Sequence, residues 1–97
     1  MDLEVAMIAV GDEKIEAFVA MMDEAGSAHL LSCPGCHSVR VLPGVENPGK
    51  VLFLVEWDSA EAHTAARSSD GFAAFIRIAS PFFPPEGGGT MEHFRLR

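Results

Sequence analysis

The sequence predicts an α+β domain whose strands and helices follow the order βαββαβ. Residues 51–55 are apolar at every position, which is typical of a strand buried on both faces. Two segments, 15–25 and 60–79, have apolar residues at helical spacing and separate the predicted strands. This order is typical of the ferredoxin-like fold, an antiparallel four-stranded sheet with two helices on one face.

The composition indicates one small soluble domain over residues 1–97 with a modest core. Hydrophobic residues make up 48% of the chain, so we expect an interface and a ligand cavity besides the core. No apolar run approaches the roughly 20 residues that cross a bilayer. The formal net charge of -7 disfavours nucleic acid and anionic membranes. The acidic N-terminus is unlike a secretory signal, and we expect a cytoplasmic protein.

The first strand is expected over 3–10, which has no polar face. The helix that follows is expected to run to about Ala25, with Gly26 as its C-cap. Its apolar stripe has members at i, i+3, i+4 and i+7, namely Ile15, Phe18, Val19 and Met22.

The second and third strands are expected over 37–42 and 50–57, with Val39 and Val41 on one face of the second. The segment 43–49 between them is rich in proline and glycine, which predicts a hairpin with a long loop. Since the third strand leaves neither face for solvent, helices should cover one face and a second copy of the chain the other. The sequence therefore predicts a homodimer that pairs through the sheet face.

The second helix is expected to begin with a capping box of Asp58 and Glu61. It is expected to break near Ser68, where Ser69 can cap it again. The helix should then end at Ser80-Pro81.

After this helix, residues 82–89 are too rich in proline and glycine for regular structure and predict a loop. Residues 90–96 alternate in polarity and predict a closing strand. This strand completes the βαββαβ order.

Several short motifs resemble those of one known family. They are Glu56-Trp57, Ser59, Glu61-Ala62, Ser69 and Phe72-x-x-Phe75, with Pro34-Gly35-Cys36 as a supporting match. Together they resemble the antibiotic-biosynthesis monooxygenase family over residues 30–75. The resemblance implies a dimeric α+β barrel. Family members include quinol and anthrone oxygenases that use neither flavin nor metal, haem-degrading enzymes, and proteins acting on small signalling molecules.

Haem-degrading members differ from this chain at three positions. They use an asparagine on the first strand, which has none here, and a tryptophan and a histidine on the second helix, where this chain has Ala66 and Ile76. Haem degradation is therefore disfavoured. The histidine that other members often have on this helix would also fall at Ala66, whereas this chain has His63 one turn earlier.

His63 is the candidate general base, because an imidazole exchanges protons near neutral pH. The alternative is a helix histidine that faces solvent. Arg40 could pair with a substrate anion or form a surface ion pair. Four aromatic residues could wall an apolar cavity for a flat aromatic substrate, although a plain core needs the same residues: Trp57, Phe53, Phe72 and Phe75.

The segment Cys33-Pro34-Gly35-Cys36-His37 matches the pattern of covalent haem attachment. We expect a structural turn instead, since no export signal is visible. A redox pair would need a helix after Cys33, and zinc would need two further ligands. A disulfide or redox role stays open, and no metal and no cofactor are expected.

Three functions are compatible with the sequence. The first is a cofactor-independent monooxygenase of a small electron-rich aromatic compound such as a quinol, phenol or anthrone. There a base would form the substrate anion, which would reduce O2 in a dry pocket. The second is a non-catalytic dimeric module that binds or senses a small ligand, favoured by the shortage of acid–base residues. The third is an isomerase of a small carbonyl compound.

Overall fold

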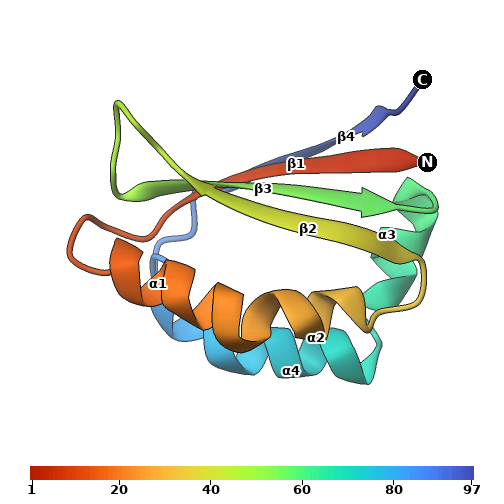
Figure 1. The fold of residues 1–97 in the computed structure, drawn as a ribbon, viewed down its shortest axis with the longest axis horizontal. Helices are drawn as coiled ribbons and strands as arrows, with labels where there is room; N and C mark the ends of the chain where they lie inside the picture. The colour runs from red at the N-terminus through yellow and green to blue at the C-terminus, as the bar shows by residue number, and fades with distance from the viewer.

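The computed structural model describes all 97 residues as an antiparallel sheet with helices packed on one face (Figure 1). The strands are β1 (Asp2–Ala9), β2 (Cys36–Pro43), β3 (Lys50–Trp57) and β4 (Thr90–Arg95). The helical segments are α1 (Ile15–Met21), the π-helical η1 (Met22–Gly26), α2 (Ser27–Leu31), α3 (Ala60–Ala66), α4 (Asp70–Ala79) and the 3-10 helix η2 (Ser80–Phe82). The predicted fold class and βαββαβ order are confirmed. None of these helices has the length and apolar character needed to span a bilayer.

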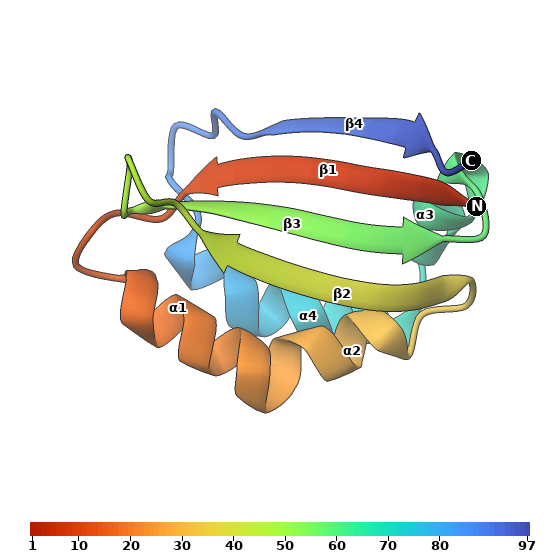
Figure 2. The same ribbon diagram turned by 45° about the horizontal axis from the view of Figure 1, so that its top comes forward.

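The sheet has the strand order β2-β3-β1-β4, and each neighbouring pair is antiparallel. The central strands are therefore β1 and β3, and Figure 2 shows β2 and β4 at the two edges. The predicted hairpin joins β2 to β3, with a bulge between Cys36 and Ser38. In the same view α3 lies near the end of the sheet where β3 finishes and β1 begins, and the other helices lie beneath the strands.

The alternation of β3 explains how the sheet is covered. Its residues that face the helices are at most 7% exposed: Val51, Phe53, Val55 and Trp57. Leu52 and Leu54 point to the opposite face and stay partly exposed. The prediction that helices cover one face is confirmed. The prediction that a second copy covers the other stays a prediction.

The predicted end of the first helix is wrong. The chain stays helical through η1 and α2 to Leu31, and Gly26 has the helical angles φ −58° and ψ −47° instead of a C-cap conformation. Leu30 is buried in the core, so the added turns extend the apolar face. A Cβ atom at Gly26 would lie 2.5 Å from the Met22 sulfur. The glycine therefore makes room for a packed methionine and does not end the helix.

The predicted capping box is also wrong, by one residue. Ser59 is the N-cap of α3, and its hydroxyl accepts the Ala62 N–H at 3.0 Å. Asp58 instead pairs with the side chain of His37. The predicted break is confirmed, because α3 ends at Ala66 and Ser69 caps α4. The predicted helix end before Pro81 and the closing strand are confirmed as well.

The packing of α2 against α4 depends on Gly71. A Cβ atom there would lie 2.7 Å from the His29 carbonyl oxygen and would also collide with the Ser32 hydroxyl. We expect Gly71→Ala to lower the free energy of unfolding by about 1–3 kcal/mol, although alanine favours a helix by roughly 1 kcal/mol. Urea denaturation measures the change. Ala73→Gly, at an exposed position of α4, should lower the free energy of unfolding only through the poorer helix propensity of glycine. An unchanged or higher midpoint for Gly71→Ala would contradict this packing.

Candidate functional site

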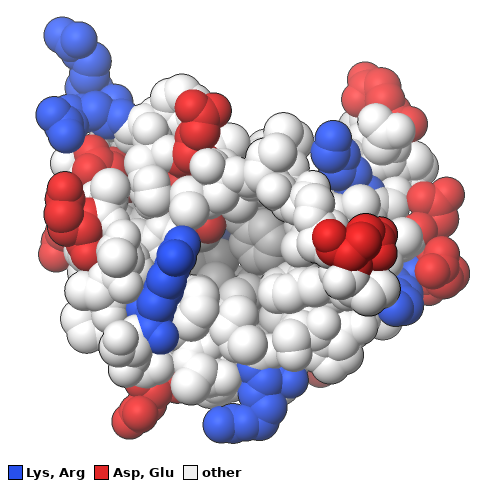
Figure 3. All heavy atoms as spheres, turned by 180° about the vertical axis from the view of Figure 1, so that it is seen from behind, with Lys and Arg blue, Asp and Glu red and all other residues white.

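A cavity of about 440 Å³ lies between the sheet, α3, α4 and the segment 83–91. Ten of its 15 lining residues are hydrophobic, and the volume falls within the roughly 300–1,000 Å³ usual for small-ligand sites. Figure 3 shows the molecule hollowed on the side opposite to that of Figure 1, with few charged atoms around the hollow. A small apolar molecule therefore fits this cavity.

Three titratable residues line the cavity: Glu4 from β1, His63 from α3, and Arg67 directly after α3. Glu4 Oε1 lies 3.4 Å from His63 Nε2. The helix is held beside β1 because the Asp2 carboxylate accepts the Ala60 N–H at 2.8 Å. The cavity thus has apolar walls and a polar end where α3 meets β1.

His63 is 5% exposed, so the alternative of a solvent-facing helix histidine is wrong. Its ring stacks on Trp57 with centroids 4.7 Å apart and planes at 11°. Burial, with smaller contributions from His93 and Arg67, lowers the pKa of His63 to about 4. The imidazole is therefore neutral near pH 7.

Glu4 is placed by strand pairing, since it faces Val55 of β3 and His93 of β4. Its Oε1 accepts the indole N–H of Trp57 at 3.0 Å. Burial raises the pKa of the Glu4 carboxyl above its usual range, and the Trp57 hydrogen bond opposes part of this rise. A buried carboxyl group beside a ligand cavity is a candidate proton acceptor.

These residues lie in one row of close polar contacts. His63 Nδ1 lies 2.8 Å from His93 Nε2. We assign the proton of the neutral His63 ring to Nε2, because this nitrogen faces the Glu4 carboxylate at 3.4 Å. His63 Nδ1 then accepts the N–H of His93, which is half-buried. The row therefore connects the cavity to the edge of the sheet.

The residues predicted from the sequence are partly brought together. His63 and the aromatic residues Phe53, Phe72 and Phe75 line the same cavity. Trp57 is fully buried behind His63 and does not line it. Arg40 is exposed and pairs with Leu54 on the opposite face of the sheet, away from the cavity. Whether these side chains bind a substrate stays a prediction.

Three residues of the polar end were missed by the sequence reasoning: Glu4, His93 and Arg67. Glu4 gave a signal, because it is the acidic residue inside an apolar strand and shares the face of Ala6 and Ile8 by the period of two. His93 gave a signal only together with the β1–β4 register.

The two cysteines have different surroundings. Cys33 is buried, and the Ser69 hydroxyl lies 3.4 Å from its sulfur, which ties the turn to the start of α4. Burial raises the pKa of the partly buried Cys36 thiol to about 11, which disfavours a reactive thiolate. Both thiols are free, and a redox or disulfide role stays a prediction.

The fold and the cavity define a small ferredoxin-like protein with one apolar site that has a titratable end. The model of the family described as "Antibiotic biosynthesis monooxygenase" matches residues 1–78, so the chain belongs to that family. The predicted family is therefore confirmed. No curated protein matches the chain.

Solved structures resemble the whole chain. A Bordetella bronchiseptica protein named "Putative antibiotic biosynthesis monooxygenase" is 22% identical, with a TM-score of 0.79 over 99% of this chain and 96% of that one. A conserved Methanosarcina mazei protein is 22% identical, with a TM-score of 0.75 over 99% and 92%. A structure named antibiotic biosynthesis monooxygenase is 16% identical, with a TM-score of 0.76 over 100% and 99%. Such low identities establish the fold alone.

The lowered pKa of His63 predicts acid sensitivity. In the unfolded chain the His63 imidazole becomes protonated below its ordinary pKa of 6.5, whereas in the folded protein it stays neutral down to about pH 4. The free energy of unfolding therefore falls as the pH falls through this range. We expect a loss of about 1–2 kcal/mol between roughly pH 7.5 and 5, partly offset by Glu4, whose raised pKa acts in the opposite sense. Urea denaturation at both pH values measures it.

The matched variant is His63→Phe, which keeps a ring stacked on Trp57 and removes the titration. Its free energy of unfolding should change less with pH than that of the wild type. Equal pH dependence in the two proteins would show that His63 is not held in the neutral form by burial.

Proposed function

We propose that the protein is a cofactor-independent monooxygenase of a small electron-rich aromatic compound, such as a quinol, phenol or anthrone. The observation that supports this most is an apolar cavity with a largely buried Glu4–His63 pair at one end, whose side chains approach to 3.4 Å. Phe53, Phe72 and Phe75 offer aromatic walls to a flat ring. Membership of the antibiotic biosynthesis monooxygenase family agrees with this chemistry.

In the proposed reaction the polar end removes a proton from the bound substrate. The substrate anion gives one electron to O2, and the resulting radical and superoxide combine to a peroxide. Loss of water from the peroxide leaves one oxygen atom in the product and places the other in water. The substrate supplies all four electrons that reduce O2, and the apolar walls keep water away from the reactive anion.

The geometry favours Glu4 over His63 as the first proton acceptor. A pKa of about 4 makes the His63 imidazole a weak base, whereas burial raises the pKa of Glu4. His63 remains part of the proposed machinery, because its Nε2 lies 3.4 Å from the Glu4 carboxylate and its Nδ1 faces His93.

A non-catalytic ligand-binding module explains the site less well. An apolar ligand needs no carboxyl group in the wall, and burying Glu4 costs free energy. An isomerase of a small carbonyl compound could use the same Glu4–His63 pair for proton transfer. The two enzymes differ in one requirement, since only the monooxygenase consumes O2.

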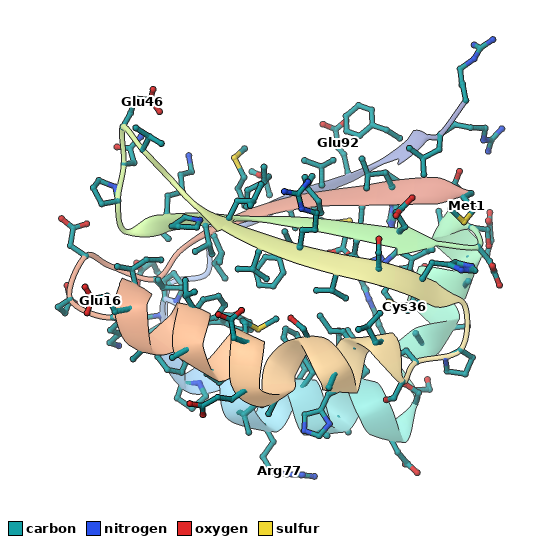
Figure 4. All side chains as sticks on the ribbon, in the orientation of Figure 1. Met1, Glu16, Cys36, Glu46, Arg77 and Glu92 are labelled. Atoms are coloured by element: carbon teal, nitrogen blue, oxygen red, sulfur yellow. The ribbon has the colours of Figure 1, made fainter.

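The Glu4→Gln variant tests the proposed base. We expect the wild type to consume O2 with at least one member of a panel of quinols and anthrones, measured with an oxygen electrode. Glutamine keeps an acceptor for the Trp57 N–H but cannot take a proton, so kcat should fall about 10²–10⁴-fold. The control Glu92→Gln makes the same change on β4, where Figure 4 shows Glu92 on the side of the sheet away from the helices.

Other outcomes assign the site differently. Product formation without O2 would favour the isomerase, and binding without any turnover would favour the module. Unchanged turnover in His63→Ala would remove His63 from the reaction.

We also propose that the protein is a homodimer that pairs through the uncovered sheet face. Phe94 is 51% and Met7 39% exposed on this face, and the neighbouring strands add more apolar side chains. The apolar residues of this face are Leu3, Val5, Met7, Leu42, Leu52, Leu54 and Phe94, and polar residues such as Arg40, Glu56 and Glu92 lie among them. An apolar sheet face of this extent is typical of an interface between subunits, and two such faces together would form the α+β barrel.

Leu54→Glu tests the dimer, because it places a charge in the middle of this face. We expect light scattering after gel filtration to give the mass of two chains for the wild type and of one chain for the variant. The control Leu31→Glu changes a leucine of α2 that is 45% exposed and should stay dimeric. A wild type with the mass of one chain would contradict the proposal.

A further inference from the structure

Arg67 stands out among the lining residues of the cavity. It is the only lysine or arginine in the lining. None of the three ion pairs of the structure includes it. The polar end of the cavity therefore contains a cation whose N–H donors have no carboxylate partner in the protein.

We propose that Arg67 binds an anionic oxygen of the ligand, so that the cavity selects flat aromatic compounds that carry a carboxylate at the polar end or form a phenolate or enolate there. The inference rests on the proposed function in taking this cavity as the substrate site. It adds a substrate class and a residue that recognises it.

Charge complementarity supports the inference. A guanidinium group presents its N–H donors in a planar fork that matches an oxyanion better than a lysine does. The chain as a whole has a net charge of -7, which repels anions elsewhere on the surface. Arg67 is exposed to solvent, and a ligand bound against the apolar walls would displace water from one side of its guanidinium group, which strengthens their attraction.

Arg67 also complements the role of Glu4. When an ionised Glu4 takes a proton from a substrate hydroxyl, the negative charge moves from the carboxylate to the substrate oxygen. The Trp57 N–H bonds the Glu4 carboxylate and cannot follow that charge. Arg67 lines the same end of the cavity and is free to stabilise the new anion. Glu4 therefore accepts the proton, and Arg67 stabilises the anion that forms.

A simpler role for Arg67 is to stabilise the C-terminus of α3 by its charge. That role needs only a cation near the helix end, and it affects folding without distinguishing between ligands. Ligand selectivity is therefore the measurement that separates the two roles.

The test compares 2-naphthoate with its neutral counterpart 2-naphthamide by calorimetric titration. We expect the wild type to bind the carboxylate more tightly than the amide. Arg67→Met should weaken 2-naphthoate about tenfold and leave 2-naphthamide unchanged, since a charge-assisted hydrogen bond is lost. Arg67→Lys should fall in between. The control Arg77→Met removes the same charge from α4, where Figure 4 shows Arg77 pointing away from the sheet.

A second ligand distinguishes the two kinds of anion. The absorbance of 4-nitrophenol reports its ionisation, so a larger ionised fraction on the wild type than on Arg67→Met would assign phenolates to the site. Selective loss of 2-naphthoate alone would assign carboxylates. Either result supports the proposal.

Equal binding of the two naphthalenes, no binding of either, or the same loss of both in Arg67→Met would overturn the proposal. Thermal denaturation of each variant shows whether folding has changed. The binding experiment needs no turnover. Selective binding without O2 uptake would therefore contradict the proposed monooxygenase and leave the anion site standing.

Discussion

The indole of Trp57 is the group on which the rest of the site depends. It ends β3 with no exposed surface, so its N–H must find an acceptor inside the protein. Glu4 of the neighbouring strand supplies that acceptor, and His63 covers the ring by stacking on it. The same packing that satisfies the core therefore buries a carboxyl and an imidazole beside the cavity. The raised pKa of Glu4 and the lowered pKa of His63 both follow from this burial. The packing of Trp57 at the end of β3 therefore sets the protonation states of the site.

Because side chains alternate along each strand, the ligand site and the proposed dimer interface lie on opposite faces of the sheet. On the helix side, Glu4 of β1 lines the polar end of the cavity, and its register partner His93 of β4 contacts His63. On the other side, Leu52 and Leu54 leave an apolar face with no helix over it. Because alternate residues serve opposite faces, ligand chemistry and subunit pairing can change independently in sequence.

Much of the fold could be predicted because its signals are local. The apolar strand 51–57, the turn-rich hairpin and the break near Ser68 each depend on adjacent residues. The errors arose where two local interpretations compete: a glycine can end a helix or let side chains pack against it, as Gly26 does. The site was predicted only in part: His63 of α3 and Phe72 and Phe75 of α4 lie within one short stretch of the sequence. Glu4 and His93 join them through strand pairing, which no local pattern reveals.

The break between α3 and α4 connects fold and function. A continuous helix through residues 66–70 would place Arg67 in a regular turn, with its neighbours packed on both sides. Instead α3 ends at Ala66, Ser69 begins α4, and the short junction leaves Arg67 beside the cavity with Phe72 and Ile76 of α4 in the adjoining wall. The cation and the apolar wall therefore come from two sides of one junction. Ile76 is an apolar member of this wall, so the junction places the cation next to a surface that offers no competing polar group.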